Sequence, residues 1–186
     1  MTNRIDRFQR APSDLRRYKK YTHDLGKTYG SVQHFIQHER VRWAHVTSSG
    51  RPPFTEPSDY KILYNDWPYG IDEDVAHLVV WTKFPLQEED GPATEGGVLT
   101  RRARAEVDDF VTRTFCDEGA GGMARDQVVW FKSWPSLKSV PGLEHFHVMT
   151  YKAPSGFLDR ITGGDRPIVK TFKRLERYSS NKEKNS

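Results

Sequence analysis

The sequence predicts a single α+β domain with a central antiparallel sheet, flanking helices and an N-terminal helical arm. Its length of 186 residues is that of one domain. Short apolar runs that are typical of strands surround one strongly amphipathic helix. The 11 prolines, the 14 glycines and the hydrophobic share of 35% fit a soluble α+β protein with long loops.

Composition divides the chain into four segments. Residues 1–42 carry a net charge of +6 and residues 166–186 a net charge of +5, whereas the stretch between them carries −7. We expect a flexible N-terminus (1–12), a helical arm (13–50), an α+β core (58–165) and a basic, partly disordered tail (166–186).

Two capped helices are expected in the arm. Ser13 is the predicted N-cap of a helix that ends at Gly26. Ser31 is the predicted N-cap of a second helix that reaches Trp43. Residues 51–57 contain three prolines and are expected to form an extended linker to the core.

The core is expected to alternate strands with one long helix, which Thr100 caps. Polar and glycine-rich residues 87–97 predict a mobile surface loop ahead of that helix. In chain order, the expected elements are a strand at 60–64, a buried strand at 77–84 that His77 opens, a helix at 101–115, a strand at 128–132, a strand at 145–151 and a helical turn at 157–161.

The last predicted strand carries the candidate chemistry, because histidines alternate in it with apolar side chains. His145 and His147 are expected on one face, together with Met149. Phe146 and Val148 are expected on the opposite face. Two imidazoles side by side can bind a metal, hold a phosphate, or act as a nucleophile and its partner.

Composition argues against a membrane or a nucleic-acid partner. No apolar run approaches the ~18 residues of a membrane span, and residues 1–10 lack the apolar centre of a signal peptide. The basic ends come without zinc-finger spacing or an aromatic RNA-binding motif. Cys116 is the single cysteine, so no internal disulfide can form and a cytoplasmic or nuclear location is expected.

Four motifs follow one another along the core. They are YNDWPYG at residues 64–70, HLVVWTK at residues 77–83, WFK at residues 130–132 and HFHVM at residues 145–149. In this order they resemble the fungal N-acetylglucosamine-induced protein family, over most of residues 15–165. The name of that family concerns induction, so this resemblance implies no chemical activity.

A second resemblance does imply chemistry. His77 opens an apolar strand that ends near Lys83, and Ser139 with Val140 precedes the His-x-His strand. The same order of elements is similar to the histidine-triad (HIT) nucleotide hydrolases and transferases, which implies a HIT-like outline for the core. It also implies that His147 is the nucleophile that attacks phosphorus, that His145 supports it, and that Asp66 holds a ribose.

Two departures from the HIT pattern bear on the reaction. Met149 stands where the third histidine would be, and a thioether cannot donate a proton to a leaving group. Sugar-nucleotide transferases of the same superfamily keep two histidines and place Gln there. The spacing from Ser139-Val140 to the first histidine is also two residues longer, which moves the loop that would hold the phosphate.

Two arrangements of the histidines are compatible with the sequence. As a nucleophile, His147 needs an acceptor for its other ring nitrogen, for which a backbone carbonyl, Glu144 and Asp66 are candidates. Donors for the phosphoryl charge would then be His77, Lys132, Lys138 and Ser139. Alternatively, His77, His145 and His147 are the three ligands of an open zinc or iron site.

Three functions therefore stay open. The first is a nucleotidyl or phosphoester hydrolase or transferase that needs no cofactor and acts through His147 on a nucleotide or another phosphorylated small molecule. The second is a metal-dependent enzyme, and the third a non-catalytic small-molecule-binding or regulatory protein; a homodimer is compatible with each. The expected substrate-binding residues are Asn65, Asp66, Trp67, Tyr69, Lys132 and Ser139.

Overall fold

A computed structural model describes residues 12–89, 98–133 and 140–169. Within these ranges the chain is α+β, with an antiparallel four-stranded sheet in the order β1-β2-β6-β5. This confirms the predicted fold class. The strands are β1 (Tyr60–Tyr64), β2 (Val75–Thr82), β5 (Val128–Phe131) and β6 (Glu144–Tyr151).

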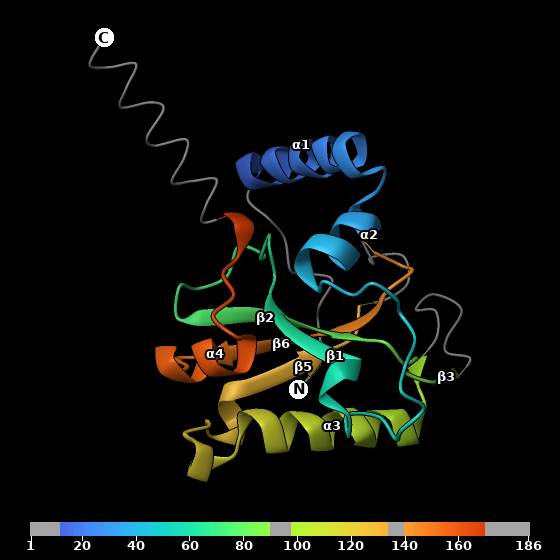
Figure 1. The fold of residues 1–186 in the computed structure, drawn as a ribbon. Helices are drawn as coiled ribbons and strands as arrows, with labels where there is room; N and C mark the ends of the chain where they lie inside the picture. The colour runs from blue at the N-terminus through green and yellow to red at the C-terminus, as the bar shows by residue number, and fades with distance from the viewer. Residues whose placement is uncertain (1–11, 90–97, 134–139, 170–186) are drawn as a thin grey trace.

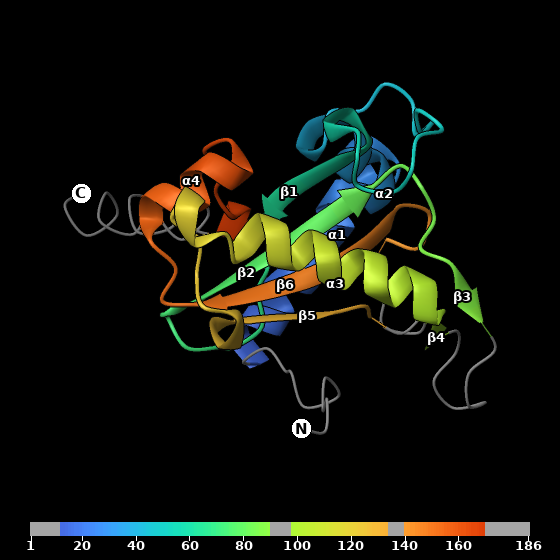
Figure 2. The same cartoon turned by 90° about the horizontal axis from the view of Figure 1, so that it is seen from below.

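Helices cover both faces of the sheet (Figure 1). The arm, with α1 (Pro12–Tyr29) and α2 (Val32–Phe35), lies over one face. The amphipathic helix α3 (Arg101–Phe115) crosses the other face, and α4 (Ser155–Thr162) packs beside it against the same cluster of buried residues (Figure 2). The sheet is thus the middle layer of three.

Strand alternation decides which side chains meet which helices. Phe146 and Val148 of β6 have no exposed surface and lie in the cluster formed with α3 and α4. His145 and His147 project to the opposite side, where the register sets them across from Trp81 and Val79. The predicted division of this strand into an apolar and a histidine face is confirmed.

The arm differs from its prediction at both helices. Ser13 lies inside α1 and does not cap it, and the helix continues past Gly26 to Tyr29. It ends because Gly30 takes a φ of 78°, which glycine adopts without strain. Ser31 does cap α2, by accepting a hydrogen bond from the backbone N–H of His34 at 3.0 Å.

The second arm helix is short and changes its hydrogen bonding. After α2 it continues as a π-helical turn, η2 (Ile36–Arg40), and stops before the predicted end at Trp43. The proline-rich linker also departs from an extended chain: Phe54 in it takes a φ of 61° and is buried against Phe110, with ring centroids 4.3 Å apart. Burial of this ring, rather than backbone preference, sets the path of the linker.

The strands of the core lie close to their predicted positions. Strand β1 has its predicted bounds, whereas β2 begins two residues before His77 and ends before Lys83. The predicted surface loop is partly a small hairpin, in which β3 (Glu88–Glu89) pairs with β4 (Val98–Leu99). The predicted helical turn is the longer helix α4, which ends at Gly163 in the left-handed conformation.

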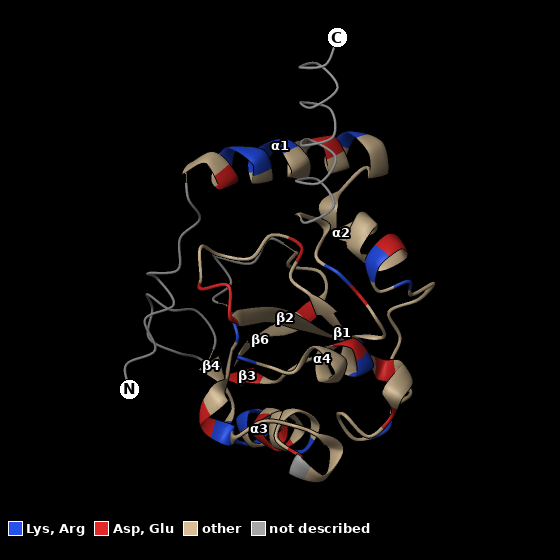
Figure 3. Ribbon diagram, turned by 90° about the vertical axis from the view of Figure 1, so that its left-hand side faces the viewer, with Lys and Arg blue, Asp and Glu red and all other residues tan. Residues whose placement is uncertain are grey.

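Helix α1 carries charged residues of both signs. Lys and Arg mark several positions on α1, interrupted by Asp14 and Asp24 (Figure 3). In the part of the chain that the structure describes, no helix is both long enough and apolar enough to cross a membrane.

Candidate functional site

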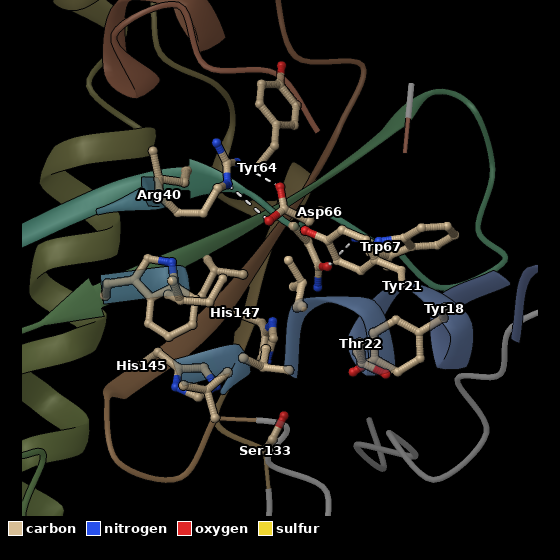
Figure 4. Close-up of a pocket in the computed structure, with 18 of the residues that line it drawn as sticks. Tyr18, Tyr21, Thr22, Arg40, Tyr64, Asp66, Trp67, Ser133, His145 and His147 are labelled. Carbon is tan, nitrogen blue, oxygen red and sulfur yellow. Dashed lines mark hydrogen bonds and ion pairs between the residues drawn. The ribbon is translucent and has the colours of Figure 1, made fainter. Parts of the chain in front are cut away.

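A pocket of about 100 Å³ lies between the arm and the histidine face of the sheet. Figure 4 shows His145 and His147 below the Arg40–Asp66 pair, with Tyr18, Tyr21 and Trp67 along the side of α1. Aromatic rings and imidazoles therefore form much of its wall. The residues that line it are Tyr18, Tyr21, Thr22, Leu25, Val32, Ile36, Arg40, Leu63, Tyr64, Asn65, Asp66, Trp67, Tyr69, Val79, Trp81, Ser133, Val140, His145 and His147.

His147, which lines the pocket, forms a hydrogen-bonded pair of imidazoles with His77. Nε2 of His77 lies 3.0 Å from Nδ1 of His147, and the two side chains are 3% and 8% exposed. His147 is stacked on the ring of Phe131, its neighbour across the sheet, at 5.0 Å between centroids. His77 is stacked on Tyr69 at 5.4 Å. Ring stacking thus restricts the orientation of both imidazoles.

His145 is held by its backbone neighbourhood. Its Nδ1 donates to the carbonyl oxygen of Leu143 at 2.7 Å, so a neutral His145 keeps its lone pair on Nε2. The ring packs on Trp81 at 4.6 Å and meets His147 edge-on at 5.6 Å. Both histidines of the His-x-His strand line the pocket.

The structure differs from the sequence in what accompanies His147. A backbone carbonyl, Glu144 and Asp66 were the expected acceptors for its second ring nitrogen, and the structure places a further group, His77, at hydrogen-bond distance from Nδ1. Glu144 forms an ion pair with the ammonium of Lys132, and Asp66 forms one with Arg40. The register of the two strands explains this contact. His77 lies opposite Met149, and His147 is two residues before Met149 on the same face, so the two imidazoles are diagonal neighbours.

The loop at residues 65–70 contributes to the pocket wall. Asn65, Asp66, Trp67 and Tyr69 all line the same pocket as His147. The ring of Trp67 is 5% exposed and lies 5.4 Å from that of Tyr21 on α1. The loop therefore connects the arm to the sheet, and the role of these residues in binding a ligand stays a prediction.

Arg40 ties three parts of the chain together at the edge of the pocket. It donates to Asp66 at 2.9 Å and, through two nitrogens, to Asp165 at 2.8 and 3.0 Å. Asp165 also accepts the backbone N–H of Tyr64 at 2.9 Å. The side chains are 11–13% exposed, so the ion pairs are largely shielded from water.

Burial changes the titration of Asp66. Loss of solvation raises the pKa of its carboxyl from 3.8 to about 6, because Arg40 offsets only part of that cost. Burial and the nearby Asp66 charge likewise raise the pKa of the Tyr21 hydroxyl, which stays protonated at neutral pH. The pocket edge thus holds a carboxyl group whose pKa lies above the ordinary value.

Lys132, one of the expected substrate-binding residues, does not line the pocket. Lys132 follows β5, and its ammonium lies 2.5 Å from Glu88 and 3.0 Å from Glu144. These pairs join the β3–β4 hairpin to β6. Ser139, together with Lys138, lies outside the described residues.

The alternative of a metal site gains no support from the positions of the histidines. Nε2 of His77 and Nδ1 of His147 point at each other in a hydrogen bond, which leaves neither free to meet a common ion. In the three described ranges, no group of three His, Cys, Asp or Glu side chains is placed to hold a metal ion.

Sequence reasoning missed the contribution of the arm. Tyr18, Tyr21 and Thr22 from α1 and Arg40 from η2 line the pocket, although the arm was expected as a separate element. Spacing alone offered one signal, since Tyr18, Tyr21 and Leu25 recur along one side of a helix. Nothing in the sequence indicated the partners of Arg40, which are 26 and 125 residues away.

Three comparisons place the chain among known proteins. A family model described as "Protein of unknown function (DUF3605)" matches residues 1–151. The Candida albicans "N-acetylglucosamine-induced protein 1" is 26% identical over 188 residues, which covers 92% of this chain and 72% of that protein. These matches confirm the resemblance to the fungal N-acetylglucosamine-induced proteins.

A second relative and a solved structure extend this picture. The Saccharomyces cerevisiae "Uncharacterized protein YPL067C" is 25% identical over 143 residues, or 71% of this chain and 66% of that protein. The structure titled "Crystal Structure of HTC1" superposes with a TM-score of 0.64 at 20% identity, covering 86% of this chain and 88% of that one. At this identity the likeness shows that the fold is shared.

Proposed function

We propose that this chain, which belongs to the family described as "Protein of unknown function (DUF3605)", is an enzyme that acts through His147 on a nucleotide or another phosphorylated small molecule. The observation that carries the proposal is the hydrogen bond from His77 to His147, because His147 lines an aromatic pocket. This hydrogen bond engages Nδ1 of His147, and the proposed reaction uses its other ring nitrogen, Nε2.

The chemistry follows from that nitrogen. A lone pair on Nε2 would attack phosphorus, forming a P–N bond while the bond from phosphorus to the leaving oxygen breaks. Water would then attack the phosphorus and release the histidine. His145 and Ser133 line the same pocket, and the ring of His145 contacts that of His147 edge-on. The Ser133 hydroxyl, and His145 in its protonated form, would donate hydrogen bonds to the phosphoryl oxygens.

Met149 narrows the class of substrate. It follows the His-x-His motif on the same strand face and cannot supply a proton to a departing oxygen. This favours leaving groups that are stable as anions, such as a phosphate released from a phosphoanhydride, over alkoxides. The rings of Tyr18, Tyr21 and Trp67 offer area on which a base or a sugar can pack.

The test is a comparison of turnover and covalent labelling. Purified protein is incubated with nucleoside diphosphates, nucleotide sugars and sugar phosphates, and products are separated chromatographically while intact mass reveals a phosphoryl or nucleotidyl adduct. We expect His147→Ala to abolish turnover and the adduct, and His145→Ala to reduce turnover less. Binding should weaken only slightly in His147→Ala, because most contacts come from the pocket wall.

Two further variants make the test specific. His45→Ala removes an exposed histidine outside the pocket and should leave turnover unchanged. Met149→His should raise turnover on substrates with poor leaving groups, because it restores a proton donor. Unchanged turnover of His147→Ala on whichever substrate is found would overturn the enzyme proposal.

A specific observation favours a second candidate, a small-molecule-binding protein without catalysis. Arg40 is the cation that lines the pocket among the described residues, and its guanidinium is held by Asp66 and Asp165. An anionic substrate would have to compete with these carboxylates. If ligands raise the melting temperature but no compound in the panel is converted, this candidate is favoured.

We also propose a cytosolic or nuclear location. It is supported by Cys116, because a chain with a single cysteine forms no internal disulfide. The thiol is part-buried at the end of α3, and burial raises its pKa, so it is a weak nucleophile. Recovery of a tagged protein in a secreted or membrane fraction would contradict this location.

A further inference from the structure

Asn65 bonds both the pocket loop and His77, and its two amide groups are not interchangeable there. Its Oδ1 accepts the backbone N–H of Trp67 at 3.0 Å. A backbone N–H can only donate, so the amide must turn its oxygen toward Trp67 and its Nδ2 toward the other side. On that side lies Nε2 of His77, at 3.3 Å.

The orientation of this amide decides which nitrogen of His77 carries a proton. Nδ2 of Asn65 can only donate, so Nε2 of His77 must present a lone pair to it. The same Nε2 is 3.0 Å from Nδ1 of His147. Because Nε2 of His77 is an acceptor, the proton in that hydrogen bond must belong to His147.

We infer that Asn65 is a positioning residue that sets the tautomer of His147. A neutral imidazole has one N–H, and in His147 that proton is placed on Nδ1. The lone pair is therefore on Nε2, the nitrogen that the proposed reaction uses. This role rests on the proposed function, and it differs from the substrate contact that the sequence suggested for Asn65.

Further contacts keep the three side chains in line. The backbone N–H of Asn65 donates to the carbonyl oxygen of His77 at 2.8 Å, which holds the two residues side by side where β1 ends. Tyr69 is stacked on His77 and Phe131 on His147, which limits rotation of either ring. The packing therefore keeps Nδ1 of His147 directed at Nε2 of His77, while the Asn65 amide selects which of the two nitrogens carries the proton.

The arrangement also assists the transfer step. As Nε2 of His147 bonds to phosphorus, the ring gains positive charge and its Nδ1–H becomes more acidic. That proton is already donated to Nε2 of His77, so the second imidazole can share the charge as it develops. Asn65 thus acts on the reaction through two histidines and needs no contact with the substrate.

The test reads the tautomer directly. Protein labelled with ¹⁵N is studied at about pH 8, above the ordinary imidazole pKa of ~6.5, by long-range proton–nitrogen correlation of the histidine rings. In the wild type we expect Nδ1 of His147 to be protonated and Nε2 unprotonated. The opposite assignment in the wild type would overturn the inference.

Asn65→Asp reverses the demand on His77 with almost no change in shape. A carboxylate can still accept the N–H of Trp67, but its other oxygen can no longer donate, so Nε2 of His77 must carry a proton. Nδ1 of His147 then becomes the acceptor and its proton moves to Nε2. We expect the reversed tautomer in the spectrum, and a loss of kcat of at least tenfold with a smaller change in KM.

Asn65→Ala serves as the matched variant, because it removes the donor without adding an acceptor. It should give a mixture of the two tautomers and an intermediate kcat, whereas a merely structural role would leave the ring assignments of all three proteins alike. An unchanged tautomer in folded Asn65→Asp, checked by circular dichroism, would overturn the inference.

The spectra need no substrate, so the two proposals can fail separately. Normal turnover in His147→Ala would overturn the proposed enzyme while the tautomer assignment stood. Dependence of turnover on His147 together with a protonated Nε2 in the wild type would overturn the role of Asn65 alone.

Discussion

The two faces of the sheet are built from alternate residues of the same strands, yet one face forms an apolar core and the other forms a pocket. On the face covered by α3 and α4, Leu78, Val80, Phe146 and Val148 have no exposed surface and lie in one apolar cluster. On the face covered by the arm, histidines and large aromatic residues surround a pocket. Strands β2 and β6 each supply residues to both faces.

The difference shows how stability and chemistry can be divided within one strand. Apolar side chains interdigitate without directional demands, so they fill the α3 face at native density. Imidazoles and the Arg40 ion pairs must keep hydrogen-bond geometry, so they are held at fixed positions around the pocket. We therefore expect stability to depend most on the α3 face and ligand chemistry on the other.

The largest effect should come from the apolar face. Phe146→Ala removes a fully buried ring and should lower the free energy of unfolding by about 4 kcal/mol, from lost burial and the cavity that remains. The neighbouring His147→Ala should cost about 2 kcal/mol, because the hydrogen bond to His77 and the ring contacts with Phe131 and His145 are lost. Urea denaturation of both variants measures the difference.

Equal losses in the two variants would break the comparison, since the histidine would then be as important to folding as the phenylalanine. A larger loss in His147→Ala would also mean that its effect on turnover could not be separated from unfolding.

Arg40→Met tests the strongest polar contact beside the pocket. Methionine keeps much of the side-chain volume but leaves Asp66 and Asp165 without the cation that they share. We expect a loss of about 3 kcal/mol, because buried carboxylates without a partner are costly. The measurement is urea denaturation at pH 7. The same variant should recover part of its stability at pH 5, where a carboxyl can be protonated; a loss that does not change with pH would contradict the electrostatic cause.

The pH dependence of stability should reveal the titration of Asp66 on the pocket side of the sheet. The pKa of Asp66 is raised to about 6 in the folded protein from an ordinary 3.8, so the folded state holds its proton more tightly than the unfolded state. Its contribution is present below about pH 4 and is lost as pH rises through 6. The free energy of unfolding should fall by about 3 kcal/mol across this window through this group alone.

Asp66→Asn isolates that contribution. Subtracting its pH–stability curve from that of the wild type removes the titrations common to both proteins. Parallel curves would show that Arg40 keeps the carboxylate ionised in the fold, and the raised pKa would be wrong.

The smallest effects should come from two matched helix caps. Ser31 accepts from His34 N at 3.0 Å over the pocket, and Thr100 accepts from Ala103 N at 3.1 Å over the apolar face. Replacing either by Ala should cost about 1 kcal/mol in urea denaturation. Only Ser31→Ala should weaken ligand binding, because α2 lines the pocket through Val32; an equal loss of affinity in Thr100→Ala would contradict the division between faces.

The sequence by itself determined the elements of the core and their faces. Strand β1 and helix α3 have their predicted bounds, and Thr100 caps α3 as expected. Alternation placed His145 and His147 opposite Phe146 and Val148, because successive side chains of a strand point to opposite sides. These features depend on neighbours along the chain, which a sequence displays.

Other features depend on contacts between residues far apart, and only the tertiary structure decided them. The register of β2 against β6 brought His77 to His147, and packing of the arm placed Tyr21 and Arg40 at the pocket. Lys132 was turned toward Glu88 and Glu144 by pairing of charges that its spacing does not reveal. Local preferences are worth tenths of a kcal/mol to about 1 kcal/mol per residue, so burial and long-range hydrogen bonding override them wherever the two disagree.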